Sequence, residues 1–232
     1  MTIAERLARV RAGMAEACSR CGRDPGSVRL VAVSKGQPAA AVAEAFQAGQ
    51  RVFGESYVQE ALAKREALAG LAAQWHYIGG LQANKARHVA GRFALVHSVD
   101  SLNLARLLHN KAQALGLIQP VLVQVNVAGE PQKRGVSETG LAALAEEIAG
   151  LSGLALQGLM VMPPYDEDPE RSRPHFARLR ELADGLRVRL GPGLAELSMG
   201  MSHDYGVAIE EGATLVRVGT AVFGPRPCAL AR

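Results

Sequence analysis

One lysine of this sequence stands directly after an apolar run, where its amine could attack a carbonyl group. Lys35 follows residues 30–33, and partial burial there would lower the pKa of its amine and leave it nucleophilic. Arginine keeps its proton near neutral pH, so this chemistry is confined to the five lysines, Lys35, Lys64, Lys85, Lys111 and Lys133. Lys85 falls in a helical stretch and Lys133 in a polar loop. A solvent-facing lysine at a strand end is the alternative interpretation of Lys35.

Two turns near the end of the chain combine glycine with hydroxyl groups. Ser198-Met199-Gly200 and Gly219-Thr220 each follow a short apolar run and offer backbone N–H groups beside a side-chain hydroxyl. In barrels of alternating strands and helices, the connections after strands seven and eight commonly bind a phosphate. Tight turns that need glycine only for backbone reasons are the alternative interpretation.

An arginine inside the last apolar run adds a third group. Arg217 lies between Val216 and Val218, and because an unpaired buried charge is very costly, it must face a ligand or pair with a neighbouring strand. A lysine, a phosphate cradle and an arginine together suit a ligand that carries both an aldehyde and a phosphate. Pyridoxal 5′-phosphate (PLP) is such a ligand, and so is a sugar phosphate that an aldolase holds as a Schiff base. The spacing does not choose between them.

The elements that must position these residues alternate between short apolar runs and longer helical patterns. The runs are mostly continuous, as in strands buried on both faces, and cover residues 30–33, 51–54, 75–79, 94–97, 121–126, 156–161, 196–199 and 215–219. Helical spacing marks residues 2–21, 39–48, 102–115 and 141–149. Such alternation predicts parallel strands with right-handed crossovers.

This alternation favours an α/β fold, a single (β/α)8 TIM barrel domain over residues 1–232 with an extra N-terminal helix. A doubly wound open sheet is the alternative, but no Gly-x-Gly-x-x-Gly follows the first run. No Pro-, Ser- or Gly-rich linker divides the chain. Because a barrel gathers its chemistry at the carboxyl ends of its strands, Lys35, Arg217 and the two turns should meet at one mouth.

Composition and charge exclude several classes of protein. Hydrophobic residues make up 48% and charged residues 21% of the chain, an ordinary globular composition with a net charge of +4. Basic residues are spread along the sequence, which argues against nucleic-acid binding, and no apolar run is long enough to span a membrane. The first residues do not form a secretory signal, so we expect a cytoplasmic protein.

Cys18 and Cys21 have the spacing of a redox or zinc pair. No second pair accompanies them, and a redox pair would follow a strand, whereas this one ends a helical pattern. We therefore interpret the pair as incidental and expect no metal site.

Six segments of the chain resemble the family of pyridoxal phosphate homeostasis proteins (YggS/PROSC type). They run in order between residues 3 and 226 and read VAVSK (31–35), FGESY (53–57), WHYIGGLQANK (75–85), GLM (158–160), LSMGMS (197–202) and VRVGTAVFG (216–224). The resemblance implies a barrel of fold type III, like the barrel domain of alanine racemase without that enzyme's second domain.

The same resemblance implies roles for single residues. Lys35 would hold PLP as an internal aldimine, and Arg217 would lie beside the pyridine nitrogen and keep it unprotonated. Ser56 stands where the family usually has asparagine, so a polar contact to the cofactor is lost or bridged by water. The implied phosphate positions are Ser198, Met199, Gly200, Gly219 and Thr220.

The function implied by the resemblance is binding PLP and controlling its supply, without defined catalytic turnover. PLP-dependent apoenzymes would be the recipients, and we expect a monomer because the second domain that usually drives racemase dimers is absent. A small single-domain amino-acid racemase is the alternative, and a Schiff-base aldolase is another. A racemase needs a second base opposite the lysine, for which the spacing singles out none of Tyr57, Tyr77, Tyr165 and His203.

Overall fold

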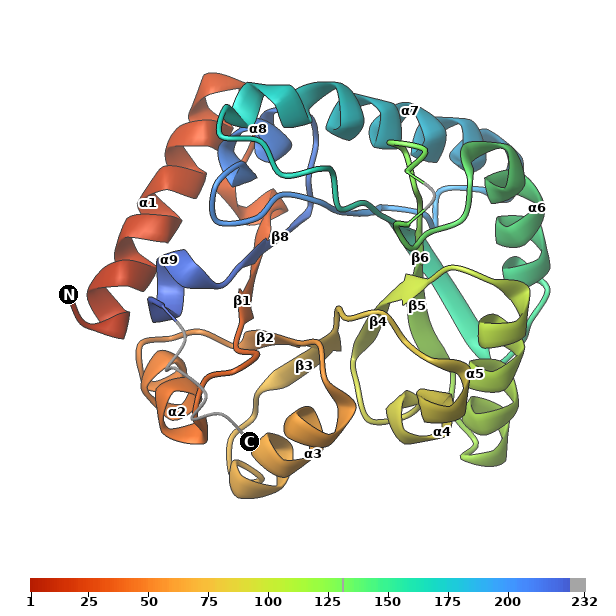
Figure 1. Cartoon of the computed structure of the whole chain (residues 1–232), viewed down its shortest axis with the longest axis horizontal. Coiled ribbons are helices and arrows are strands. Elements are labelled where there is room, and N and C mark those ends of the chain that lie inside the picture. Colours follow the sequence, from red (N-terminus) through yellow and green to blue (C-terminus); the bar gives the residue numbers. More distant parts are fainter. Residues whose placement is uncertain (131, 226–232) are drawn as a thin grey trace.

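Eight parallel strands close into a barrel in the order in which they occur in the sequence (Figure 1). The computed structural model describes residues 1–130 and 132–225. The strands are β1 (Arg29–Val33), β2 (Val52–Glu55), β3 (Gln74–Tyr77), β4 (Leu95–Val99), β5 (Gln119–Gln124), β6 (Leu154–Met160), β7 (Glu196–Ser198) and β8 (Leu215–Val218). Pairing of β1 with β8 completes the ring. The predicted barrel is therefore confirmed, and the open sheet is excluded because its edge strands would not pair with each other.

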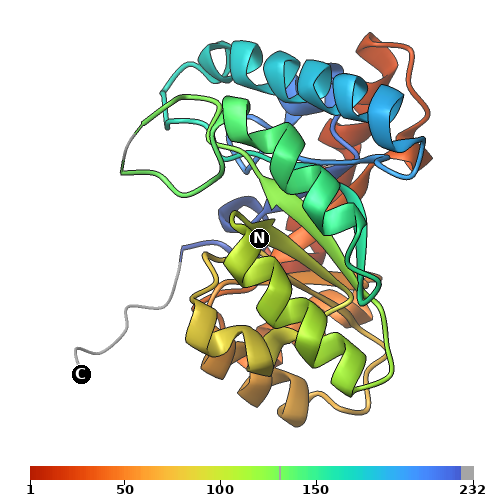
Figure 2. The ribbon, with the colours of Figure 1, turned by 90° about the vertical axis from the view of Figure 1, so that its right-hand side faces the viewer.

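Helices surround the barrel, and α5, α6 and α7 lie side by side along its outside (Figure 2). The α-helices are α1 (Ile3–Arg20), α2 (Ala39–Gln47), α3 (Val58–Ala67), α4 (Ala86–Val89), α5 (Leu102–Ala114), α6 (Glu138–Ala149), α7 (Arg173–Leu190), α8 (Tyr205–Glu210) and α9 (Thr220–Phe223). Short 3-10 helices are η1 (Pro25–Ser27), η2 (Ala83–Lys85) and η3 (Pro169–Ser172). None of the helices described is long and apolar enough to cross a membrane.

The predicted N-terminal helix is α1, which packs against α2, α8 and α9. A capping box starts it: the Glu5 N–H donates to Thr2 Oγ1 over 3.2 Å, and the Thr2 N–H donates to Glu5 Oε2 over 2.9 Å. Arg6 Nη1 donates to the Phe223 carbonyl at the end of α9 over 3.0 Å. The first helix is thereby joined to the turn that follows the last strand.

Side chains of alternate residues fill the barrel interior. Val31, Leu95, Leu122, Met160 and Leu215 form an apolar cluster there. Successive side chains of a strand point to opposite faces, so the next inward residues of β4 and β8 toward their carboxyl ends are His97 and Arg217. Both are buried. The barrel interior is therefore polar directly under the mouth and apolar farther toward the amino ends of the strands.

The two cysteines of the C-x-x-C segment lie at the end of α1, as predicted. Cys18 is buried and Cys21 half-buried, and both are free thiols. Burial raises the pKa of the Cys18 thiol, which keeps it protonated and unreactive. Within residues 1–130 and 132–225 no three His, Cys, Asp or Glu side chains gather as a metal site. Cys228 and the end of the predicted 1–232 domain lie outside the described residues.

Candidate functional site

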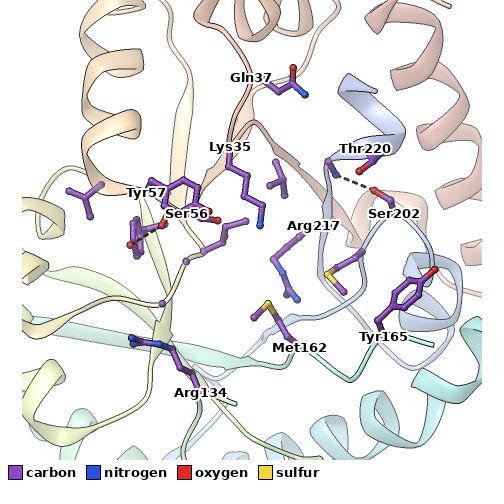
Figure 3. Close-up of a pocket in the computed structure, with 18 of the residues that line it drawn as sticks. Lys35, Gln37, Ser56, Tyr57, Arg134, Met162, Tyr165, Ser202, Arg217 and Thr220 are labelled. Carbon is purple, nitrogen blue, oxygen red and sulfur yellow. Dashed lines mark hydrogen bonds between the residues drawn. The ribbon is translucent and has the colours of Figure 1, made fainter. Parts of the chain in front are cut away.

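A cavity of about 870 Å³ opens at the carboxyl ends of the strands (Figure 3). Residues that follow most of the strands line it, among them Lys35, Ser56, Tyr57, Tyr77, Lys85, Arg134, Met162, Tyr165, Ser202, Arg217, Gly219 and Thr220. The barrel thus brings together residues that lie nearly 190 positions apart in the sequence.

Lys35 enters this cavity from the turn after β1, and its side chain extends toward Arg217 (Figure 3). Backbone hydrogen bonds hold the residue before it: the Ser34 N–H donates to the Gly54 carbonyl over 3.0 Å, and the Gln37 N–H donates to the Ser34 carbonyl over 3.0 Å. Lys35 is therefore held at the mouth by β2 on one side and by its own tight turn on the other.

A buried group of charged side chains lies behind the Lys35 turn, between the barrel wall and α3. We call Ser34, Glu55, Glu60 and Lys64 the Lys64 cluster. Lys64 Nζ donates to Glu55 Oε1 over 2.8 Å and to Glu60 Oε1 over 2.7 Å. The Ser34 hydroxyl donates to Glu55 Oε1 over 2.6 Å. Burial raises the pKa of Glu55, although Lys64 and Ser34 oppose the shift by stabilising its carboxylate.

The Lys64 cluster also binds the backbone on both sides of Lys35. Lys64 Nζ donates to the carbonyl of Ser34 over 2.5 Å, and the N–H of Gly36 donates to Glu60 Oε1 over 2.6 Å. The cluster therefore fixes the direction in which the Lys35 side chain leaves the main chain.

A turn rich in hydrogen-bond donors lies across the cavity from Ser56 and Tyr57. Ser202 Oγ accepts the backbone N–H groups of Gly219 and Ala221 over 3.2 and 3.3 Å (Figure 3). A Cβ at position 219 would lie 3.3 Å from the Val33 carbonyl oxygen, so the turn packs closely against the end of β1. The hydroxyls of Ser202 and Thr220 can each donate a hydrogen bond to a phosphate, while the Gly219 and Ala221 amides hold the Ser202 side chain in place.

Arg217 forms part of the floor of the cavity and is only 3% exposed. Its Nη1 donates to Ser198 Oγ over 2.6 Å and its Nη2 to the Val161 carbonyl over 2.8 Å. Burial lowers the pKa of Arg217 to about 10, so the guanidinium stays charged at neutral pH, while Asp204 acts in the opposite direction. The cavity therefore has a positive floor.

Comparisons with known proteins show the family of this chain. The family model described as "Alanine racemase, N-terminal domain" matches residues 6–227. A Pseudomonas aeruginosa protein is 51% identical over 227 residues, covering 97% of this chain and 96% of the relative. An Aquifex aeolicus protein is 46% identical over 226 residues, covering 97% and 99%. Both are named pyridoxal phosphate homeostasis protein. This chain belongs to the pyridoxal phosphate homeostasis protein family.

Solved structures place the fold of this family member in a wider group. PipY of Synechococcus elongatus superposes with a TM-score of 0.87 at 42% identity, covering 96% of this chain and all of that one. A second PipY structure, with PLP bound, gives a TM-score of 0.85 at 41% identity. Alanine racemase from Corynebacterium glutamicum superposes with a TM-score of 0.74 at 16% identity, and this chain covers 64% of it. The latter likeness shows the fold alone.

The structure brings only part of the predicted phosphate site of this family member to the cavity. Gly219 and Thr220 line it, whereas Ser198, Met199 and Gly200 do not. Ser198 and Met199 are fully buried. Gly200 has a φ of +88° and leaves no room for a Cβ, which would lie 2.6 Å from Ala208 Cβ. The phosphate role of these three residues stays a prediction.

Sequence reasoning missed Ser202 as a site residue, although it ends the segment 197–202. Ser202 stands four positions after Ser198 and lines the cavity. Its hydroxyl in this segment was the signal that could have marked it as a phosphate-binding candidate. Arg134 also lines the cavity, where its Nη1 donates to the Leu81 carbonyl over 3.4 Å. Lys133, the neighbouring cation, instead pairs with Glu130 over 2.9 Å.

Ser56, at the position where the family usually has asparagine, lies in the cavity wall opposite Ser202 and Thr220 (Figure 3). The Tyr77 hydroxyl donates to the Ser56 carbonyl over 3.1 Å (Figure 3). Gly79 lets the two segments approach, because a Cβ there would lie 2.3 Å from that carbonyl oxygen. The backbone of Ser56 is thus fixed, and its short side chain leaves space in the wall.

Proposed function

We propose that this chain binds PLP through Lys35 and acts in PLP homeostasis in the cytoplasm, without defined catalytic turnover. The observation that carries this proposal is the convergence of Lys35, Arg217 and the turn of Ser202, Gly219 and Thr220 in one cavity. The names of the relatives and the PLP-bound structure of PipY support it.

The residues present fit the chemical groups of PLP. The Lys35 amine suits its aldehyde, and the Ser202 and Thr220 hydroxyls suit its phosphate. Arg217 can only donate hydrogen bonds, so it suits a ring nitrogen that is unprotonated. When bound, PLP supplies an electrophilic carbon and a ring that withdraws electrons. The chain's part is to hold both ends of the ligand while Arg217 keeps a proton away from the ring.

The rim of the cavity supports binding rather than turnover. Racemisation needs a second proton-transfer group opposite the lysine, held close to the substrate. Tyr57, Tyr165 and His203 are exposed, so burial fixes none of them against a ligand. The hydroxyl of buried Tyr77 already donates to the Ser56 carbonyl. Exchange of the Cα hydrogen of amino acids for solvent deuterium should therefore not exceed the rate with free PLP; faster exchange would contradict the absence of turnover.

A visible spectrum with and without borohydride tests the proposed function. We expect the protein to gain an absorption band after incubation with PLP, and borohydride to convert the bond to Lys35 into a stable secondary amine that mass spectrometry locates. A colourless protein after incubation would end the proposal. A sugar aldehyde that is trapped without visible absorption would favour an aldolase instead.

Replacing Ser202 with alanine should weaken PLP binding about tenfold or more, because a hydrogen bond to a charged group is worth about 1.5–3 kcal/mol. Absorbance titrations with PLP and with pyridoxal, which has no phosphate, measure the effect. Only the PLP affinity should fall, and Ser152→Ala, at a serine that does not line the cavity, should change neither. Equal losses for both ligands would show that Ser202 acts through the fold of the turn.

We further propose that the chain is a monomer and that PLP-dependent apoenzymes receive its cofactor. Light scattering on the eluting protein tests the first statement, with a dimer mass as the contradicting result. Reactivation of a PLP-free apoenzyme by the loaded protein, faster than by the same total PLP released into a phosphate buffer, tests the second.

A further inference from the structure

Four buried polar side chains form a line of hydrogen bonds across the barrel interior beneath the cavity. Arg217 Nη1 donates to Ser198 Oγ over 2.6 Å, Ser198 Oγ lies 2.8 Å from His97 Nδ1, and His97 Nε2 lies 3.0 Å from His76 Nδ1. None of the four is more than 3% exposed. They come from β8, β7, β4 and β3, so the line joins opposite sides of the barrel.

The direction of these hydrogen bonds follows from the donors available. Arginine has no acceptor, so Ser198 Oγ accepts from Arg217 and its own hydrogen must find another acceptor. Among the described residues, His97 Nδ1 is the remaining partner of this hydroxyl. His97 Nδ1 is therefore the acceptor and its Nε2 carries the hydrogen. That hydrogen is then donated to His76 Nδ1, which leaves the proton of His76 on Nε2.

The line contains no negative charge. Burial lowers the pKa of His76 to about 3 and that of His97 well below its usual range, so both rings are neutral. No carboxylate of the described residues lies within ion-pair distance of Arg217. Buried Asp204 is instead occupied by the Met201 N–H over 2.6 Å and the Ser172 hydroxyl over 2.9 Å.

We propose that His97 and Ser198, backed by His76, are positioning residues that hold Arg217 through neutral acceptors alone. A carboxylate in their place would cancel much of the guanidinium charge. With neutral partners, no direct contact compensates the guanidinium charge, and Arg217 lines the cavity. A ligand nitrogen there must act as an acceptor. Only this last step rests on the proposed function; the direction of the hydrogen bonds does not.

The tautomers can be measured without any ligand. In ¹⁵N NMR of the protein labelled at histidine, we expect His97 and His76 to be neutral near pH 7 with their hydrogens on Nε2. Assignment uses His97→Gln and His76→Gln. A hydrogen on His97 Nδ1, or a charged ring at either position, would overturn the proposal whether or not the protein binds PLP.

A pair of variants tests the positioning itself. His97→Leu removes the acceptor for Ser198, whereas His97→Gln keeps one acceptor and one donor. We expect His97→Leu to raise the Kd for PLP about tenfold and to shift the absorption maximum of the bound cofactor. His97→Gln should restore both values toward those of the unaltered protein. Met160→Leu, in the neighbouring apolar cluster of the interior, is the control for core packing.

Two outcomes would contradict positioning through His97. One is a His97→Leu protein that keeps the absorption maximum and the Kd of the unaltered protein. The other is equal change in His97→Leu, His97→Gln and Met160→Leu, which would indicate general loosening of the interior. If the unaltered protein itself fails to bind PLP, the proposed function fails. The tautomer measurement then still decides the direction of the hydrogen bonds from Arg217 to His76.

Discussion

Replacing Lys35 with alanine should abolish borohydride trapping of PLP completely. We expect no other lysine to take over, because Lys64 is buried in ion pairs, and Lys85 reaches the cavity from η2 rather than from the turn after β1. We also expect the Kd for PLP to rise at least tenfold, about 1.4 kcal/mol, since the phosphate and ring contacts remain without the covalent bond. Mass spectrometry of the reduced protein and an absorbance titration provide the two values.

Lys85→Ala and Lys111→Ala are the matched controls. Both remove a lysine amine, one at the cavity and one on α5, and both should still yield the adduct on Lys35. An adduct of undiminished yield in Lys35→Ala would move the covalent bond to another lysine. Circular dichroism of Lys35→Ala should match that of the unaltered protein, because the Lys64 cluster holds the main chain of the turn.

Replacing Lys64 with methionine should destabilise the fold by about 3–5 kcal/mol, because it leaves the Glu55 carboxylate buried with no opposite charge. Glu55 is fully buried, and one of its oxygens, Oε2, already has no hydrogen-bond partner among the described residues. For a chain of this size, such a loss lowers the Tm by roughly 10 °C. Thermal unfolding of the protein without ligand measures it.

Two further variants identify the cause of that loss of stability. Lys111→Met makes the same chemical change at a lysine for which the structure, within the residues that it describes, shows no ion pair, and its Tm should hardly move. Adding Glu55→Gln to Lys64→Met removes the unpaired charge and should recover most of the stability. If Lys64→Met unfolds at the temperature of the unaltered protein, the Lys64 cluster does not stabilise the turn of Lys35.

The barrel and the main binding groups could be predicted because their signals are local. Each run that predicts a strand is a short, mostly apolar segment, Lys35 lies two positions after the first run, and Gly219 ends the last one. Arg217 was recognisable because a charge inside an apolar strand needs a partner. The order of strands around a parallel barrel then follows from the alternation alone.

Two groups could not be predicted because they depend on pairing between distant segments. They are the buried line of Ser198, His97 and His76, and the Lys64 cluster. Ser198 is the last residue of β7, so its side chain points into the interior below the mouth, and only the turn beyond it rises to the cavity. Lys64 with Glu60 has the spacing of an ordinary surface pair on a helix. It is buried because α3 packs against β2 and brings Lys64 to the carbonyl of Ser34, which no local pattern reveals.

Closure of the barrel by β1 and β8 has a consequence for how the protein is made. A ribosome produces Lys35 well before Arg217, Gly219 and Thr220, and the interior line needs strands from both halves of the barrel. A nascent chain therefore carries an amine but no complete site until β8 has left the exit tunnel and paired with β1. The ligand can therefore be held at the complete site only after β8 has been made and paired with β1, so loading follows closure of the barrel rather than guiding it.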